Sequence, residues 1–517
     1  MRTLAIATAP LVFGLFYGAA KIGAGREQAR RVGAYVTDAE ALRVEARKKD
    51  AEVEDLRKRS FEAFDARSRE QGEELYNRAR DLATEVEKIR GRASQALEAA
   101  LTINAEREDV RDMLGDVLFE RALATERDQR PLQRDDLLQR MALYDVDGSR
   151  RGAWDAPSEL TIESSPPFAK VTLAAYTTDE RQKRWLEDGR DLGETPVAAV
   201  TLPRGSYLLS FSAKGRIEVR YPVLLKRGER LRISVDLPEI GAIQPGFIYI
   251  PAGRFLFGSA ADEMTRRQFL DAVPAHEITT GAYLISRTET TFREWIDYLQ
   301  ALPPEERARR TVKVGTSGLS NALELVELPG GTWQFTFQPV NHVYSARAGE
   351  MITYRGRSRR IVQDWLRMPV LGLSGEDAAA YAAWLNETGR VPGARLCTEL
   401  EWERAARGAD DREFPNGDHL DPDDANIDET YGQGSPGMAL DEVASHPESR
   451  SPFGVEDMAG NAHEWVSSTF STSGFAVRSG SYFHSQMTAR STNRTSLVSS
   501  YRDPRFGVRI CASIALR

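Results

Sequence analysis

The hydrophobic pattern of this chain changes its period along the sequence, and this change limits the possible folds more than any other feature. From about residue 28 to residue 145 the chain is rich in Ala, Glu, Arg and Leu, and apolar residues recur every three or four positions. This spacing, with no proline before Pro131, predicts helices. From 158 to 238 apolar and polar residues alternate between proline and glycine turns, which predicts strands. With 517 residues, we expect a third domain to follow.

The helical segment, residues 28–150, has two interpretations. A charged stalk or antiparallel coiled coil is the simpler one, because charged residues fill the positions between the apolar ones. Residues 96–101 and 114–118 also resemble tetratricopeptide-like hairpins, although stable arrays of that kind need about three repeats. The sequence leaves both open.

Residues 1–27 contain an apolar run at 4–20, with basic residues on both sides. Its length lies at the short limit for a spanning helix, while Gly18 and Ala20 could form a signal-peptidase site. We favour an uncleaved membrane anchor over a cleaved signal segment. Arg2 and the amino terminus offset part of the positive-inside bias, so the orientation stays open. We expect a membrane-anchored protein of a bacterial-type cell envelope, with the periplasmic side slightly favoured.

Charge and cysteine content exclude several classes of protein. The net charge of -8 is modest for this length and gives no concentrated basic face, so we expect no nucleic-acid partner. The chain has two cysteines, Cys397 and Cys511, too few for a disulfide-rich scaffold or a Cys-rich zinc site. Two buried unpaired thiols are the favoured interpretation. A single disulfide, which would imply an oxidising compartment, is the alternative.

The β segment contains Gly-Glu-Thr-Pro at 193–196 and Pro-Arg-Gly at 203–205, each before a predicted strand. In this order the strings resemble the PEGA-type repeat of bacterial envelope proteins. The resemblance implies a small antiparallel β domain at 158–238 with a surface or scaffolding role and no catalytic centre. Residues 177–190 depart from it, because they form an unusually long charged loop.

Residues 245–517 contain several further motifs. Ser374 and Thr398 are natural N-caps, and Glu401 would complete a capping box with Thr398. Near the end of the chain are Asp-Met-Ala-Gly-Asn-Ala-His-Glu-Trp at 457–465, Val-Arg-Ser-Gly-Ser-Tyr at 477–482 and Arg-Phe-Gly-Val-Arg at 505–509. These strings resemble the formylglycine-generating enzymes, also called sulfatase-modifying factors. The resemblance covers about half the chain and implies an α+β fold with C-type-lectin-like topology.

Members of that family oxidise a substrate cysteine to an aldehyde with two copper-binding cysteines, which lie just after the Gly-Ser-Tyr turn. The corresponding interval here, 483–489, contains no cysteine. His484 lies close to the first missing cysteine and is a weak catalytic candidate, because histidine can bind copper. His463 stands where the family often has tryptophan. We expect no resident copper, and whether the chain is an enzyme stays open.

The resemblance also implies binding residues. The expected ligand groove consists of Arg478, Ser481, Tyr482, Arg490 and Arg509, with a structural role as the alternative for the arginines. The expected ligands of a structural calcium ion are the side chains of Asp457 and Glu464 and the carbonyl groups of Gly460 and Ala462. Asn426 and Ile427 resemble the start of a second calcium site, whose later aspartate has no clear counterpart in 431–440.

These observations favour a membrane-anchored, non-catalytic protein that binds a peptide or another small ligand. A divergent metal-dependent oxidase and an envelope scaffold are the alternatives. Residues 309–368 match none of the motifs, and we expect an insertion that covers the groove.

Overall fold

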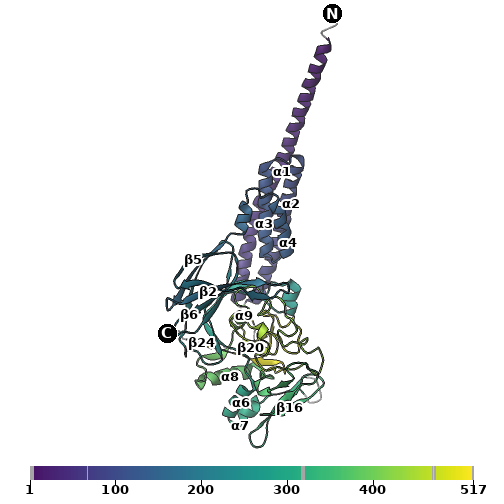
Figure 1. Cartoon of the computed structure of the whole chain (residues 1–517). Helices are drawn as coiled ribbons and strands as arrows, with labels where there is room; N and C mark the ends of the chain where they lie inside the picture. The colour runs from purple at the N-terminus through teal and green to yellow at the C-terminus, as the bar shows by residue number, and fades with distance from the viewer. Residues whose placement is uncertain (1–4, 67, 316–320, 469, 471–472, 515–517) are drawn as a thin grey trace. The chain divides into compact units, whose positions relative to one another are not determined.

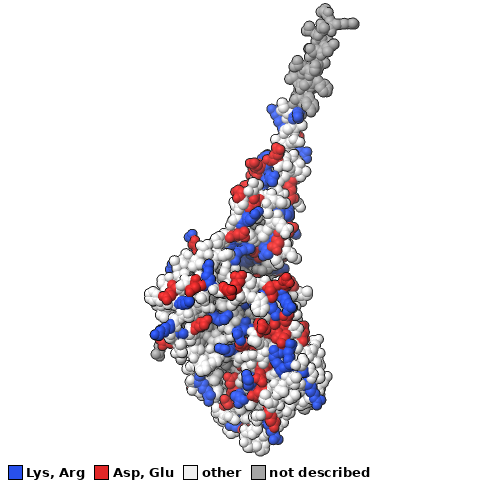
Figure 2. All heavy atoms as spheres, in the orientation of Figure 1, with Lys and Arg blue, Asp and Glu red and all other residues white. Residues whose placement is uncertain are grey.

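The computed structural model describes residues 5–66, 68–315, 321–468, 470 and 473–514, without the side chains of residues 5–20. It divides into two compact units, Met1–Ala156 and Pro157–Arg517 (Figure 1). Figure 2 shows acidic and basic side chains intermixed over much of the face in view. The expected mixed fold, with a helical N-terminal region followed by sheet domains, is confirmed.

The first unit is helical, as the apolar spacing predicts. A small-residue face of Ala46, Val53, Ala83 and Val86 is buried between the two longest helices, where such residues allow close packing. Pro131 begins a new helix at a position where its missing N–H costs nothing. The helices are α1 (Ala5–Asp65), α2 (Arg69–Ile103), α3 (Glu108–Arg127), α4 (Pro131–Ala142) and α5 (Ser149–Trp154).

The expected membrane segment, residues 4–20, lies outside the residues whose side chains are described. Within the described part of the chain, no helix is both long enough and apolar enough to cross a bilayer. The anchor therefore stays a prediction.

The second unit begins with two small sheets, in the orders β5-β1-β8 and β3-β2-β6-β7, with β4 also paired to β2. Val171, Leu209, Phe211 and Val223 point into their shared core. In contrast to the antiparallel pairing expected, β1 and β8 are parallel, because no hairpin joins these two strands. The strands are β1 (Ser158–Ser165), β2 (Lys170–Thr178), β3 (Arg184–Leu186), β4 (Arg190–Glu194), β5 (Val197–Leu202), β6 (Gly205–Ser212), β7 (Val219–Leu225) and β8 (Arg230–Asp236).

The long charged loop at 177–190 is a β2–β3 hairpin that binds an acidic loop of the following domain. Lys183 Nζ lies 2.7 Å from carboxylate oxygens of both Asp421 and Asp424. Arg184 forms ion pairs with Asp410 at 2.7 Å and with two further aspartates. The loop that departs from the PEGA-type pattern therefore fixes the β domain to its neighbour within this unit.

Outside the insertion at 309–368, the described remainder of the unit contains two four-stranded sheets, β19-β24-β12-β9 and β22-β21-β20-β23, with helices and long loops around them. Both predicted N-caps are present, since Ser374 begins α8 and Thr398 begins α9 with complete capping boxes. The elements are β9 (Phe247–Ile250), β10 (Gly253–Phe257), β11 (His276–Thr280), β12 (Tyr283–Ser286), α6 (Phe292–Ala301), α7 (Pro304–Arg310), α8 (Gly375–Glu387), β19 (Ala394–Leu396), α9 (Glu399–Arg407), β20 (His463–Ser467), β21 (Phe475–Arg478), β22 (Arg494–Ser496), β23 (Phe506–Val508) and β24 (Ile510–Ser513).

The two cysteines form a disulfide, so the favoured interpretation of unpaired thiols is wrong. Strands β19 and β24 are antiparallel neighbours, and they bring the Cα atoms of Cys397 and Cys511 to 4.8 Å. This separation lies within the range that a disulfide spans. Both residues are fully buried.

Residues 309–368 form an ordered part of the core where they are described. Their strands are β13 (Lys313–Val314), β14 (Ala322–Glu327), β15 (Trp333–Gln338), β16 (Tyr344–Arg347), β17 (Ile352–Thr353) and β18 (Val362–Gln363). Phe335 and Trp365 are fully buried and stack against each other within the main hydrophobic core. The insertion is therefore integrated into the domain by apolar packing.

Candidate functional site

Two histidines meet in the C-terminal domain, at the end of β20. Strand β20 runs parallel to β23, and His463 lies opposite Phe506 in that pairing. Because side chains alternate between the faces of a strand, His463 and Glu464 point to opposite sides. His484 comes from the turn that follows the Gly-Ser-Tyr string, where its backbone N–H donates to the carbonyl group of Ser481.

The side chains of Ser481 and His463 both lie within hydrogen-bonding distance of His484. His484 Nδ1 lies 2.8 Å from Ser481 Oγ and 3.2 Å from His463 Nε2. On its other side, His484 Nε2 lies 3.4 Å from a guanidinium nitrogen of Arg505. Asp503 binds that guanidinium group and fixes its position. Since Arg505 is always a donor, His484 accepts at Nε2 and carries its proton on Nδ1.

Both imidazole rings are neutral near pH 7. Burial, together with the neighbouring His484, lowers the pKa of His463 to about 3. Burial and the positive charge of Arg505 lower the pKa of His484 to about 4. Neutral imidazole can accept a hydrogen bond or bind a metal, so the pair offers nitrogen atoms for either purpose.

Aromatic side chains surround this pair. Phe483 packs edge-on against His484 and lies beside Arg505. Tyr482 is fully buried, and its ring contacts Phe337 of the insertion at 5.7 Å between centroids. Its hydroxyl lies 3.4 Å from Asn321 Oδ1. Residues 483–488 are partly exposed. The surface next to the histidine pair is therefore formed by the interval that follows the Gly-Ser-Tyr string and contains no cysteine.

We call His463, Ser481, Phe483, His484 and Arg505 the His484 patch. It contains a hydroxyl, two neutral imidazoles, a guanidinium group and an aromatic ring, but no thiolate. In the described part of the chain, no three His, Cys, Asp or Glu side chains converge as metal ligands. The arrangement is therefore suited to hydrogen bonding and aromatic contact.

The structure brings together only some of the predicted groove residues. Ser481 belongs to the His484 patch, and Tyr482 lies directly beneath it. Arg478, the last residue of β21, is fully buried; it pairs with Glu403 of α9 and donates to the carbonyl group of Ser491. A direct contact between the Arg478 side chain and a ligand requires this region to open, so that role stays a prediction.

The other two arginines also have protein partners. Arg509 is fully buried and donates to both oxygens of Glu464, at 2.8 to 3.1 Å. Arg490 is partly exposed and pairs with Glu413 at 3.0 Å. Of the predicted groove arginines, Arg490 is therefore the one with a partly accessible side chain.

The first expected calcium site has its carboxylates engaged by protein donors. The Glu464 carboxylate also accepts the indole N–H of Trp402 at 2.6 Å, in addition to Arg509. Asp457 accepts the backbone N–H of Ala444 at 2.5 Å, and the carbonyl group of Gly460 accepts the N–H of Ala462 at 2.8 Å. Glu289 is a further buried carboxyl group near Asp457 and Glu464. Burial and the nearby charge of Asp457 raise the pKa of Glu289 well above its ordinary value. Calcium at this position stays a prediction.

At the second expected site, the structure supplies an aspartate that the sequence motif did not locate. Asn426 donates to Asn461 Oδ1, which also accepts the backbone N–H of Asp441. Asp441 lies one residue beyond the interval 431–440, which contains no clear counterpart of that aspartate. Asn426 Oδ1 is buried without a hydrogen-bond partner, while the carbonyl group of Ile427 accepts the N–H of Thr430.

Sequence reasoning missed Arg357, Asp441 and the pairing of Arg505 with His484. Arg505 belongs to a recognised motif, and its charge next to an aspartate two residues earlier was an available signal. Arg357 lies in the basic run 355–360 of the insertion, where nothing in the local pattern indicates a buried side chain.

Comparison with known proteins agrees with the motifs. Residues 238–514 match the sulfatase-modifying factor enzyme 1-like domain, and this match is more than half of the chain. An inactive C-alpha-formylglycine-generating enzyme 2 of Mus musculus is 26% identical over 253 residues, which cover 48% of this chain and 76% of that protein. A formylglycine-generating enzyme of Mycobacterium tuberculosis is 27% identical over 234 residues, or 43% of this chain and 73% of the relative.

Among solved structures, PvdO from Pseudomonas aeruginosa matches with a TM-score of 0.35 and 23% identity, covering 52% of this chain and 94% of that one. The motifs of the C-terminal half and the match over 238–514 place the chain in one family. It belongs to the family of proteins that carry a sulfatase-modifying factor enzyme 1-like domain.

Proposed function

We propose that this protein is a non-oxidising member of its family, which binds a peptide or another small ligand at the His484 patch. The state of the two cysteines supports the proposal. The chain has two cysteines, and both are joined in the buried Cys397–Cys511 disulfide. Neither can supply the thiolate on which copper-dependent thiol oxidation in this family relies. The mouse relative, whose name describes it as inactive, offers a precedent for a family member without the oxidising activity.

The His484 patch has the chemistry of a recognition surface. The partly exposed imidazole of His484 can exchange hydrogen bonds with peptide N–H and C=O groups, while the buried His463 and Ser481 hold that ring in place. Phe483 adds an aromatic face, and Arg505 adds a positive charge that Asp503 partly neutralises. A short polar peptide with an apolar side chain is the kind of ligand that these groups fit.

The proposal includes a membrane-anchored location with the binding domain on the periplasmic side. The apolar run at 4–20 supports an anchor. The disulfide supports an oxidising compartment, because disulfides in cytosolic proteins are rare. Protease accessibility of the C-terminal domain in intact spheroplasts tests this location, and a protected domain would contradict it.

The decisive experiment offers the detergent-solubilised full chain a Cys-x-Pro-x-Arg peptide with copper(I) and oxygen. Mass spectrometry then follows the substrate cysteine, with an active formylglycine-generating enzyme as the positive control. We expect no aldehyde from this chain. Fluorescence anisotropy of a labelled peptide provides the second measurement, in which we expect binding by the unchanged chain and weaker binding by His484→Ala.

A divergent metal-dependent oxidase is a second candidate, because two neutral imidazoles lie side by side, with 3.2 Å between His463 Nε2 and His484 Nδ1. Copper titration of the unchanged chain, His484→Ala and His419→Gln distinguishes this candidate. The His419 side chain is 43% exposed and lies outside the patch, so that variant controls for adventitious binding. Copper binding that only His484→Ala abolishes, together with aldehyde formation, would establish the oxidase. The absence of both aldehyde formation and peptide binding would favour the envelope scaffold.

A further inference from the structure

Arg357 is a buried arginine with every N–H group engaged. It lies between β17 and β18 in the insertion, and its side chain has no exposed surface. Nε donates to the carbonyl group of Gly437 at 2.7 Å. One terminal nitrogen donates to Asp441 and to the carbonyl group of Arg360, and the other donates to two further carbonyl groups. Five donors therefore have five acceptors, which is the full capacity of a guanidinium group.

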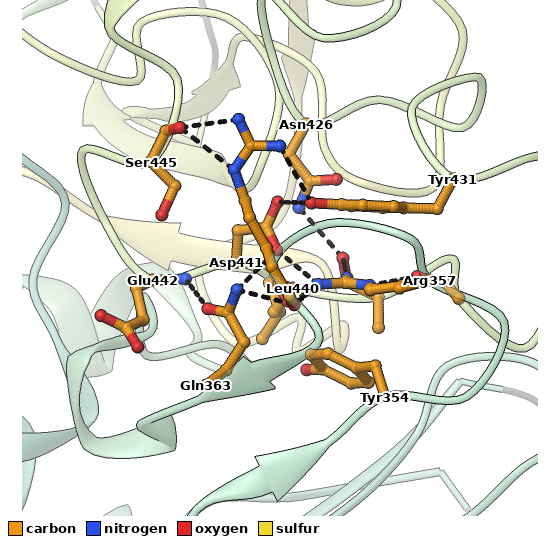
Figure 3. Close-up of polar contacts among 12 residues, drawn as sticks. Tyr354, Arg357, Gln363, Asn426, Tyr431, Leu440, Asp441, Glu442 and Ser445 are labelled. Carbon is orange, nitrogen blue, oxygen red and sulfur yellow. Dashed lines mark hydrogen bonds and ion pairs between the residues drawn. The ribbon is translucent and has the colours of Figure 1, made fainter.

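All the hydrogen-bond acceptors of the Arg357 guanidinium group are oxygen atoms. The carbonyl groups of Gly437, Ala439 and Leu440 and the carboxylate of Asp441 come from one short loop. The rings of Tyr354 and Tyr431 lie on either side of the guanidinium group, at 3.9 and 3.7 Å (Figure 3). Backbone carbonyls with a carboxylate are the oxygen ligands that a hard cation such as calcium prefers.

Asp441 has no acceptor capacity left for a metal ion. One carboxylate oxygen accepts from Arg357 at 2.5 Å and from Gln363 at 3.4 Å. The other accepts from the Tyr431 hydroxyl at 2.7 Å (Figure 3). The same oxygen lies 2.8 Å from His446 Nε2. A carboxylate offers about four lone-pair sites, and all are used. Burial alone would raise the pKa of Asp441, but His446 and Arg357 outweigh it and hold the pKa below its ordinary value.

The expected calcium donors near Asn426 therefore do not fit a calcium ion in this chain. Asn426 Oδ1 is a buried acceptor without a partner, but calcium needs six to eight oxygens. We propose that Arg357 is a built-in cation, which takes the place of bound calcium in the loop of Asn426 and Asp441. The insertion at 309–368 supplies this cation.

A built-in cation makes the loop independent of the calcium concentration. Bound calcium stabilises a fold by mass action, so that contribution disappears when calcium is removed. A guanidinium group that is part of the chain cannot dissociate, and its planar arrangement of donors fits several oxygens at once.

Thermal unfolding of the full chain, with excess calcium or excess chelator, tests the proposal. The variants are Arg357→Ala, the double variant with Asp441→Asn added, and Arg355→Ala as a matched control from the exposed part of the same run. We expect Arg357→Ala to melt at a lower temperature than the unchanged chain and to regain part of that loss in calcium. The double variant should show no gain of this kind, and Arg355→Ala should behave like the unchanged chain.

Terbium provides a measurement that does not depend on stability. Tyr354 and Tyr431 flank the loop, so terbium bound there would emit after tyrosine excitation. We expect this emission from Arg357→Ala, its loss on adding Asp441→Asn, and no Asp441-dependent emission from the unchanged chain. If Arg357→Ala does not fold alone, recovery of folded protein on refolding with calcium supports the proposal.

Three results would overturn it. One is a calcium response of the unchanged chain that Asp441→Asn abolishes. Another is folded Arg357→Ala that neither binds terbium nor responds to calcium. The third is unfolded Arg357→Ala that calcium does not rescue.

Discussion

The loop at 437–441, which contains Asp441, and the His484 patch lie in the same domain. They differ in exposure and in how fully their polar groups are paired. Asp441 has four hydrogen-bonding partners, and Arg357 uses all five of its donors. In the patch, His484 and Phe483 are instead partly exposed, and His463 Nδ1 has no hydrogen-bond partner.

This difference agrees with a structural role for the Asp441 network and with the recognition role proposed for the patch. A buried polar group without its partner costs stability, so a saturated network holds one conformation and resists change. A partly exposed side chain can exchange water for a ligand at little structural cost. The variants below test whether the two regions respond in these opposite ways.

The largest expected effect comes from breaking the saturated network. Arg357→Ala removes the buried guanidinium partner of the Asp441 carboxylate, which should lower the free energy of unfolding by about 3–5 kcal/mol. Urea denaturation measures this, with Arg355→Ala expected within about 0.5 kcal/mol of the unchanged chain. A loss below about 1 kcal/mol for Arg357→Ala would show that the network is not structural.

The disulfide should have the next largest effect. Cys397 and Cys511 are separated by 114 residues, so removing their bond frees a long loop in the unfolded chain. We expect the Cys397→Ala/Cys511→Ala double variant to lose about 2–4 kcal/mol. Adding a reductant should destabilise the unchanged chain but not the variant. Equal sensitivity of both proteins would contradict a structural disulfide.

The histidine pair should make stability depend on pH. The pKa of His463 falls from an ordinary value of 6.5 to about 3 in the folded chain, mainly through burial. Between these values the unfolded chain binds a proton that the folded chain does not. The contribution of neutral His463 to the free energy of unfolding is therefore complete above pH 6.5. It is lost as the pH falls toward 3, by up to about 1.4 kcal/mol per pH unit. His463→Gln should give a flatter profile, and identical slopes would refute the assignment.

The smallest expected effect on stability concerns Arg490. Its ion pair with Glu413 is partly exposed, so Arg490→Ala should cost at most about 1 kcal/mol. If Arg490 lines the ligand site, the same variant should weaken peptide binding several-fold in the anisotropy experiment. Unchanged affinity would restrict the site to the His484 patch.

Much of the fold could be predicted because its signals are local. The helical spacing before Ala142 and the capping boxes at Ser374 and Thr398 depend on residues that are neighbours in sequence. The absence of cysteine from the interval 483–489 was likewise visible in the sequence. The parallel pairing of β1 with β8 was not predicted, because alternation shows that a strand exists but not which partner it takes.

By itself, the sequence determined the order of the domains, the family of the last one and the absence of its thiolates, since periodicity and short motifs carry that information. The tertiary structure alone decided that Cys397 pairs with Cys511, that His463 meets His484, and that Arg357 reaches Asp441 from 84 residues away. The physical reason is that a polar group is satisfied by donors and acceptors close in space. Those partners come from distant segments, which no local pattern connects.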